Sequence, residues 1–215
     1  FDANLERFVK ETRAKGGIPV LFNSVVRSCF YQAPVENDDD EKLRKTTFAG
    51  EEKINSDTLI DTHGAYVVAP RNVAHRLNVP FVDATKITHD IETELGIAGS
   101  RKLHMWFRPG ECSQIPKGRQ DNTHYNVYGA RLVANALADE IGKQVPELKK
   151  HVRHYDYVVS TRGRGNYFTL QDAVDAVPAG KRVKVLVLDG SWKKPENMKG
   201  KKIKFILQFG AKITD

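Results

Sequence analysis

The sequence predicts an α/β fold over residues 1 to 150 and a shorter, strand-rich unit over residues 151 to 215. Patterns typical of helices and of buried strands alternate along the first part, and this order is typical of α/β proteins. The distribution of charge separates the two parts. Residues 1 to 150 hold 21 Lys and Arg and 21 Asp and Glu, whereas residues 151 to 215 hold 13 and 6. The net charge of +7 therefore resides in the second part.

The chain begins with a predicted helix and a predicted strand. Apolar or part-apolar side chains recur at helical spacing, at Leu5, Phe8, Val9 and Thr12. Gly16 and Gly17 then end the helix. Residues 18 to 26, IPVLFNSVV, form a mostly apolar run that is typical of a parallel strand buried on both faces.

A second helix and strand are predicted after a polar segment. Residues 31 to 64 are long and polar, which favours a surface excursion. A helix is expected over residues 67 to 77, with Pro70 tolerated in its first turn. Residues 79 to 85, VPFVDAT, follow as a short buried strand.

The first part should close with two more helices. One is predicted over residues 86 to 95, ended by Gly96, and an irregular loop is predicted over residues 100 to 120. The last helix is amphipathic, begins near Tyr125 and ends before Pro146.

The pattern changes after about residue 155. TLQDAVDAV should form a short helix, with Thr169 and Asp172 in a capping-box-like start, before Pro178 and Gly180. The segments VKVLVLDGSW and KIKFILQFGAKI predict two short strands about twenty residues apart, each with a turn that contains Gly. This arrangement is similar to the entry of a right-handed parallel β-helix, of which the chain would hold the first coil.

Asp121 and His124 are the strongest catalytic candidates. Their spacing allows the carboxylate to hold the imidazole in one tautomer, so that His124 acts as the general base for a Ser hydroxyl. In the alternative interpretation, Asp121 only caps the helix that starts near Tyr125. The spacing alone leaves both open.

The surrounding residues resemble a known family. The segments NLERFVKETRAKGGIPVLFNSVVR, LIDTHGAYVVAPRNVAHRLNVPFVDAT, PKGRQDNTHY and DNTHYNVYGARLVANALADEI are similar to the carboxyl-terminal part of the rhamnogalacturonan acetylesterase group of SGNH (GDSL-type) hydrolases. The likeness covers nearly all of residues 1 to 148. It implies a partial three-layer α/β/α (flavodoxin-like) domain, with Asp121 and His124 as two members of a Ser-His-Asp triad.

The chain departs from that family at the nucleophile. The family places its Ser in a Gly-Asp-Ser block, which these 215 residues do not contain. Its oxyanion-hole Gly and Asn also belong to earlier blocks. Because the chain starts without Met, we expect it to be a piece of a longer protein with these groups upstream.

The second part has a resemblance of its own. GRGNYFTLQDAVDAVPAGKRVKVLVLDGSW is similar to the amino-terminal stretch of pectin methylesterases. The catalytic residues of that family would lie beyond Asp215. The resemblance implies a pectic polysaccharide as the partner, and such a polyanion gives the basic second part a role.

Three further residues are candidate substrate contacts. Trp106 and Phe107 could stack on sugar rings near His124, although buried packing is an equal alternative. His63 precedes a helix and could approach the substrate. These assignments rest on their positions in the sequence.

No cofactor or metal is expected. His151 and His154 lack a Cys or carboxylate at ligand spacing, so they are interpreted as a solvated pair. Cys29 and Cys112 could form one disulfide or remain as thiols.

The remaining predictions concern location and partners. No run of about 18 apolar residues occurs, so no membrane association is expected. The pectic substrate implies a secreted parent protein, extracellular or periplasmic. Two rival interpretations remain: a basic nucleic-acid-binding protein and a catalytically dead polysaccharide-binding scaffold. The first would be expected to interleave aromatic residues with Arg, whereas the excess here is mostly Lys, so no nucleic-acid partner is predicted.

Overall fold

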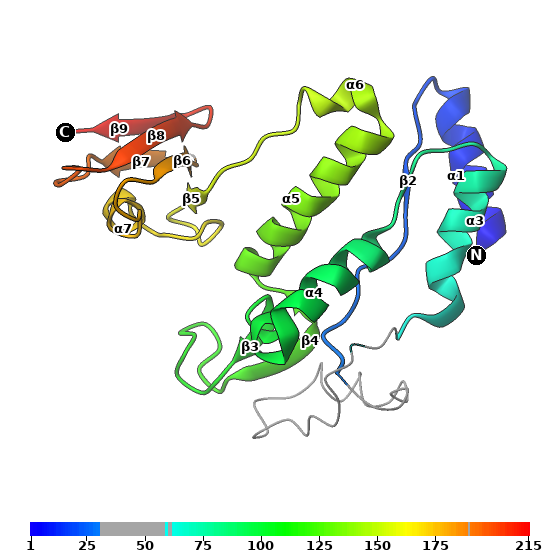
Figure 1. Ribbon diagram of the computed structural model, residues 1–215, viewed down its shortest axis with the longest axis horizontal. Coiled ribbons are helices and arrows are strands. Elements are labelled where there is room, and N and C mark those ends of the chain that lie inside the picture. Colours follow the sequence, from blue (N-terminus) through cyan, green and yellow to red (C-terminus); the bar gives the residue numbers. More distant parts are fainter. Residues whose placement is uncertain (31–58, 60–61, 189) are drawn as a thin grey trace. The chain divides into compact units, whose positions relative to one another are not determined.

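The computed structural model describes residues 1–30, 59, 62–188 and 190–215. The chain forms two compact units, Phe1–Val152 and Arg153–Asp215. Figure 1 shows the helices of the first unit and the short stacked strands of the second. Nearly all of the excursion predicted over residues 31 to 64 lies outside the described residues.

The first unit is a mixture of helices and strands. Its elements are α1 (Asp2–Ala14), β1 (Leu21–Phe22), the 3-10 helix η1 (Gly64–Val67), α3 (Val68–Arg76), β2 (Phe81–Val82), α4 (Ala84–Arg101), β3 (His104–Phe107), β4 (Arg119–Tyr125), α5 (Val127–Gln144) and α6 (Pro146–Lys149). Among the described residues, no helix has the length and apolar character needed to cross a membrane.

The two strands predicted first are present, but they are short. β1 and β2 are parallel, with Leu21 opposite Phe81, and Val9 of α1 and Ala74 of α3 belong to the apolar cluster beside them. The predicted strand over 18 to 26 does not continue past Phe22 as a ladder. The Val26 N–H instead donates to the Thr88 hydroxyl at 3.0 Å. A side-chain acceptor on a helix therefore takes the place of a neighbouring strand there.

Helix α4 consists of two helical stretches joined at Gly96. Gly96 was expected to end it, but the helical segment continues to Arg101. At Gly96 the backbone adopts φ 63° and ψ −178°, which is non-helical. A residue with a Cβ rarely adopts this conformation, so glycine permits the kink. The first helical stretch therefore ends at Gly96, as predicted, and a second helical stretch follows it to Arg101.

The prediction of an irregular loop over residues 100 to 120 was wrong at both ends of that range. β3 and β4 pair antiparallel, with Trp106 opposite Gln120 and Phe107 opposite Arg119. The sequence of β4, RQDNTHY, is almost entirely polar and lacks the alternation of apolar side chains by which half-buried strands are detected. Backbone pairing, rather than side-chain pattern, defines this strand.

Helix α5 begins immediately after β4 and is tied to the start of β3. The Asn126 side chain caps α5 by accepting from Gly129 N–H at 2.9 Å, and it donates to the carbonyls of Lys102 and His104. The helix also approaches the backbone of Leu103 closely. A Cβ on Gly129 would lie 2.1 Å from the Leu103 carbonyl oxygen. Only glycine fits this contact.

The second unit is built from parallel strands. Its elements are β5 (Tyr157–Val159), α7 (Leu170–Asp175), β6 (Arg182–Val187), β7 (Gly190–Lys193), β8 (Lys202–Leu207) and β9 (Ala211–Thr214). One sheet has the order β5-β6-β8 and the other pairs β7 with β9. Arg182 lies opposite Lys202, and Gly190 lies opposite Ala211, so equivalent strands recur after about twenty residues, as predicted. Each of the two predicted strands is, however, divided into two, β6 with β7 and β8 with β9.

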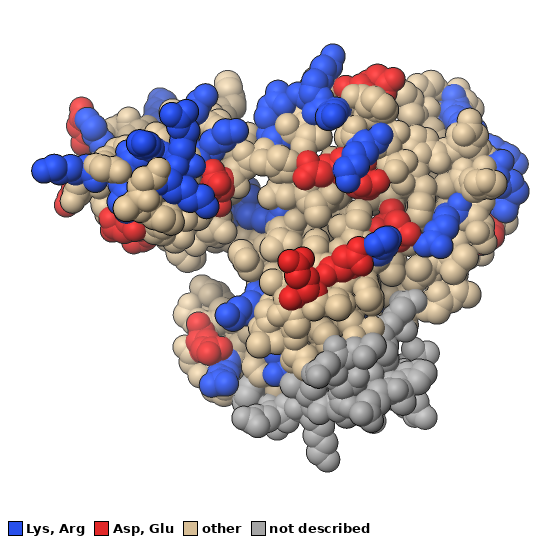
Figure 2. Space-filling view, in the orientation of Figure 1, with Lys and Arg blue, Asp and Glu red and all other residues tan. Residues whose placement is uncertain are grey.

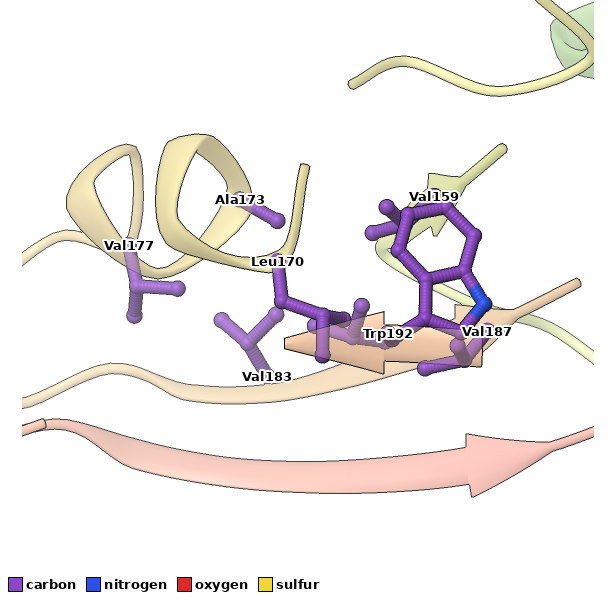
Figure 3. Close-up of a cluster of buried hydrophobic side chains, with 8 residues drawn as sticks. Val159, Leu170, Ala173, Val177, Val183, Val187 and Trp192 are labelled. Carbon is purple, nitrogen blue, oxygen red and sulfur yellow. The ribbon is translucent and has the colours of Figure 1, made fainter. Parts of the chain in front are cut away.

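Valine residues and one tryptophan form the core of the second unit. Figure 3 shows side chains of α7, β5, β6 and β7 directed toward one another, and the buried set comprises Val159, Leu170, Ala173, Val177, Val183, Val185, Val187 and Trp192. The Trp192 indole N–H donates to the Leu188 carbonyl at 2.9 Å, which satisfies its buried polar group. The predicted cap is also present, since the Thr169 hydroxyl accepts from Asp172 N–H at 3.0 Å.

The close approach of Gly129 to the backbone of Leu103 predicts whether a substitution at Gly129 stabilises or destabilises the fold. Helix propensity alone would make Gly129→Ala stabilising by about 1 kcal/mol. The clash with a backbone carbonyl should reverse this effect and lower the free energy of unfolding by about 1 to 3 kcal/mol. Urea denaturation of the wild type and the variant measures the difference. A stabilised variant would contradict the close approach of the two backbones.

Candidate active site

Asp121 and His124 lie where β4 departs from regular pairing. Met105 is opposite Asp121, but the next pair is His104 with Tyr125. Residues 122–124 of β4 are therefore inserted between two neighbouring positions of β3, as a bulge. The Asp121 carboxylate is fully buried, whereas the His124 side chain is 60% exposed.

The Asp121 carboxylate is held by the backbone of this bulge. Its Oδ1 accepts from the N–H groups of Thr123 and His124, each at 2.9 Å, and Arg119 Nη2 lies 3.1 Å from Oδ2. Burial by itself would raise the pKa of Asp121. The backbone hydrogen bonds from His124 and Thr123, together with the His124 side chain, outweigh burial and lower this pKa below its ordinary value. Asp121 is therefore ionised at neutral pH.

The His124 ring contacts the same carboxylate. Its Nδ1 lies 2.9 Å from Asp121 Oδ2 and 3.2 Å from Oδ1. An ionised carboxylate can only accept hydrogen bonds, so Nδ1 carries the proton and donates it. The neutral ring then has an unprotonated Nε2, which can accept a proton from a hydroxyl. This arrangement is that of a general base oriented by an acid.

The alternative interpretation, that Asp121 caps α5, was wrong. The cap of α5 is Asn126, through its contact with Gly129 N–H. Asp121 lies in β4, and its carboxylate accepts hydrogen bonds from the backbone of the bulge instead. The sequence misled here because both Asp and Asn are common capping residues, and the position of the helix start decides between them.

The three predicted substrate contacts occupy different places. Trp106 and Phe107 lie in β3, not in an irregular loop. Since side chains alternate along a strand, Phe107 shares the face of Asp121, and Trp106 lies on the opposite face. The Arg101 guanidinium lies 4.8 Å from the centre of the Trp106 ring. His63 immediately precedes η1. Their contact with substrate stays a prediction.

Sequence reasoning missed several groups around the pair. Arg119 lies two positions before Asp121 on the same face of β4, a spacing that could have suggested their contact. A buried carboxylate, Glu92, accepts a hydrogen bond from the hydroxyl of Tyr125, the residue after His124. No local pattern indicates that Glu92 is buried, because it lies on a helix with exposed acidic neighbours.

The structure also bears on metals and thiols. Within the described part of the chain, no group of three or more His, Cys, Asp or Glu could hold a metal ion. No disulfide joins Cys29 and Cys112, both of which are described; Cys29 is buried and Cys112 is partly exposed.

Comparison with curated proteins finds a relative. The chain is 30% identical over 152 residues to "Rhamnogalacturonan acetylesterase RhgT" of Bacillus subtilis (strain 168). This similarity supports an SGNH-type esterase relationship. The matched region is 71% of this chain and 56% of the relative, so the chain spans about half the length of the curated relative it matches. No protein-family model matches the chain, and no solved structure matches it.

The mixed α/β arrangement of the first unit is consistent with an SGNH-like domain. The name of the relative describes an acetylesterase, which is a carboxylic ester hydrolase. The pectin methylesterase resemblance of the second part has no counterpart in these comparisons.

The lowered pKa of Asp121 predicts how stability depends on pH. A carboxyl group whose pKa is lower in the folded state stabilises the fold above its unfolded pKa, and this stabilisation is lost as the pH falls through the folded pKa. Asp121→Asn should therefore be less stable than wild type by a constant amount above about pH 5, and the difference should shrink toward about pH 2.

Urea unfolding at a series of pH values measures this difference. Asp139→Asn is the control, because that side chain is exposed on α5. It should show a much smaller difference at every pH. If the Asp121→Asn difference were independent of pH across the acidic range, the carboxylate would not be held in its charged form as described.

Proposed function

We propose that this chain carries the acid and base of the catalytic triad of a carbohydrate acetylesterase acting on rhamnogalacturonan-type pectin. The observation that carries the proposal is the contact between the buried Asp121 carboxylate and Nδ1 of the exposed His124 at 2.9 Å. An ion pair that only stabilised the surface would not require one fully buried partner. The similarity to a rhamnogalacturonan acetylesterase supports the same chemistry.

The proposed reaction assigns one role to each group. His124 Nε2 accepts the proton of a Ser hydroxyl as its oxygen attacks the acetyl carbonyl carbon. Asp121 stabilises the imidazolium that forms. The protonated His124 then gives its proton to the sugar oxygen as the ester bond breaks, which leaves an acetyl-serine. Water, deprotonated by His124, attacks this intermediate. His124 then returns the proton to the Ser oxygen as the acyl bond breaks, which releases acetate and restores the Ser hydroxyl and the neutral imidazole.

The Ser itself must come from outside these residues. The 215 residues contain no Gly-Asp-Ser sequence. We propose that a segment of that type supplies the hydroxyl, and that the oxyanion donors come from the same additional region. Acetyl transfer then requires both parts of the protein.

The second unit is proposed to be the start of a pectinesterase-like parallel β-helix. The in-register stacking of β8 on β6 and of β9 on β7 supports this assignment. A parallel β-helix is built by repetition of such coils, each of which buries its apolar face against the next. The proposed whole is a pectin-directed polypeptide with deacetylating and demethylating modules.

A cationic array on the second unit supports a pectic partner. Arg182 and Lys184 of β6 lie opposite Lys202 and Lys204 of β8 in the strand register. All four side chains are exposed. Neighbouring strands lie about 4.8 Å apart and alternate residues about 6.6 Å apart, so four cations share one small face. Figure 2 shows Lys and Arg gathered on this unit. Like charges placed opposite each other repel, and an anionic polymer with regularly spaced carboxylates would relieve the repulsion.

A cavity in the same unit adds apolar surface. It has a volume of about 400 Å³ and is lined in part by Phe168, Trp192, Lys193 and Lys194. Phe168 is 64% exposed, which is unusual for a large apolar side chain and suits it to contact a sugar ring. Both lysines that line the cavity have acidic partners, Lys193 with Glu196 at 2.7 Å and Lys194 with Asp215 at 3.0 Å. In the cationic array, the nearby Asp156 carboxylate accepts from Lys184 N–H at 2.8 Å and offsets part of the positive charge.

The proposed location follows from the substrate. A protein that acts on a cell-wall polysaccharide must meet it outside the cytoplasm, so we place the protein in the extracellular space or the periplasm. The rival proposals, a nucleic-acid-binding protein and an inactive scaffold, are separated from this one by the two experiments below.

Replacement of the base tests the catalytic proposal. In a polypeptide that carries these 215 residues together with a Gly-Asp-Ser segment, His124→Ala should lower acetyl release from an aryl acetate and from acetylated rhamnogalacturonan by about 10²- to 10⁴-fold. His89→Ala is the matched control, because that side chain is also exposed, at 42%, and lies on α4. The control should retain wild-type activity.

The 215-residue chain alone should release no acetate, because its base has no positioned hydroxyl to activate. Undiminished turnover by His124→Ala would rule out His124 as the general base. Absence of any turnover in the polypeptide with the added segment would favour the inactive scaffold.

Replacement of the cationic array tests the proposed partner. Changing Arg182, Lys184, Lys202 and Lys204 to Gln should weaken binding of polygalacturonate by about tenfold or more at low ionic strength and reduce its dependence on salt. The matched control replaces four exposed lysines of the first unit, Lys10, Lys15, Lys117 and Lys149. The control should bind as the wild type does.

Isothermal titration at several salt concentrations measures both quantities. Unchanged affinity and salt dependence in the array variant would show that these residues only solubilise the surface. Tighter binding to single-stranded DNA than to polygalacturonate at equal salt would instead favour the nucleic-acid alternative.

A further inference from the structure

A buried cluster of polar side chains lies beside the Asp121–His124 pair. At its centre is Glu92 of α4, which is fully buried. The Glu92 carboxylate accepts from the Ser100 hydroxyl at 2.7 Å and from the Tyr125 hydroxyl at 2.8 Å. His104 Nε2 lies 3.1 Å and 3.2 Å from its two oxygens. Three side chains from separate segments thus converge on one carboxylate.

The cluster cannot be a second active site. Glu92, Ser100 and His104 are all fully buried, so no substrate reaches them. Burying a carboxylate is costly unless several hydrogen bonds compensate for lost hydration. Glu92 receives such compensation only because the kink at Gly96 redirects the second half of α4. On a straight helix, Glu92 and Ser100 would be about 12 Å apart along the axis.

Both ends of the β4 bulge, residues 122–124, are attached to this cluster. At one end, Tyr125 follows His124 and donates to Glu92, and its ring lies 4.5 Å from the ring of His104. Burial, and then the charge of Glu92, raise the pKa of Tyr125, so its hydroxyl stays protonated and remains a donor.

At the other end, the Asn122 carbonyl accepts from Ser28 N–H at 2.8 Å. The Ser28 hydroxyl lies 2.5 Å from the Ser100 hydroxyl, which in turn donates to Glu92. The residues inserted in β4 are therefore held from two sides through a single carboxylate.

We propose that Glu92 is a positioning residue that holds the β4 bulge in the conformation in which His124 donates to Asp121. The inference rests on the proposed function for its catalytic consequence, but the geometry that it predicts is measurable without catalysis. Without Glu92, Tyr125 and Ser100 lose their common acceptor. The Tyr125 end of the bulge is then released, and the Asn122 end keeps its bond to Ser28 N–H but loses the link from Ser28 through Ser100 to the carboxylate. His124 would then leave Asp121 for part of the time.

The test compares Glu92→Gln and Tyr125→Phe with matched controls. Glu94→Gln changes an exposed acidic side chain on the same helix, and Tyr128→Phe removes a hydroxyl from an exposed ring on α5. The first readout is the tautomer of His124 in the 215-residue chain, measured by long-range ¹H–¹⁵N spectra under alkaline conditions in which imidazoles are neutral. Wild type and controls should show mainly the Nδ1–H form.

Both cluster variants should shift His124 toward the Nε2–H form. In the polypeptide with a Gly-Asp-Ser segment, they should also lower kcat by about 10- to 100-fold with little change in KM, because a small displacement of a catalytic group costs rate rather than binding. A purely structural role for Glu92 would reduce thermal stability without changing the tautomer of the folded protein.

Two outcomes overturn the proposal. One is a folded Tyr125→Phe variant with the wild-type tautomer; this substitution removes a single hydroxyl, so it keeps the test available if Glu92→Gln does not fold. The other is a tautomer shift of equal size in the controls. If the wild-type polypeptide released no acetate, the proposed function would fail while the tautomer measurement still decided the role of Glu92.

Discussion

The pairing of β3 with β4, together with the interruption of that pairing, is the constraint on which the first unit depends. Regular pairing from Phe107 to Met105 places Asp121 at a fixed position. The register then shifts at His104, so that residues 122–124 have no partners in β3. A regular strand would put Asp121 and His124 on opposite faces, because three residues is an odd number of steps. The bulge is what allows a carboxylate and an imidazole at this spacing to meet.

The elements around the bulge hold it by hydrogen bonds and by a close backbone contact more than by apolar packing. Asn126 joins the first turn of α5 to the carbonyls on either side of Leu103, and Gly129 lets that helix lie against the same segment. From the other side, α4 contributes a buried carboxylate and a hydroxyl. The segment between Asp121 and Asn126 is therefore bounded by polar contacts at each end, which explains how so hydrophilic a sequence is ordered next to a core.

Residues with periodic apolar patterns were predicted well. α1, α3 and α5 lie where the spacing of their apolar residues placed them, and the Thr169 cap is present. In the second unit, the two predicted strands are each divided into two, and β5 was not predicted. β3 and β4 were not predicted, since a polar strand has no side-chain pattern to detect. The break at Gly96 was predicted, but the helical stretch that follows it to Arg101 was not.

The candidate site could be predicted only in part from the sequence. The sequence indicated the spacing of Asp121 and His124 but not which of the two is buried. It also gave no sign of Glu92, whose importance depends on contacts with residues 8 to 33 positions away along the chain. Such contacts are set by tertiary structure, and local propensity carries no information about them.

Because β6 and β8 are parallel, residues twenty positions apart lie opposite each other on the two strands and form columns across the sheet. Lys184 is met by Lys204, and Val183 is met by Ile203, although twenty residues separate the members of each pair. The residue that limits what can be accepted at one position is therefore found on the neighbouring strand, twenty residues away, rather than next to it in the chain. Selection on such a surface acts on columns, so residues twenty apart should change together more often than sequence neighbours do.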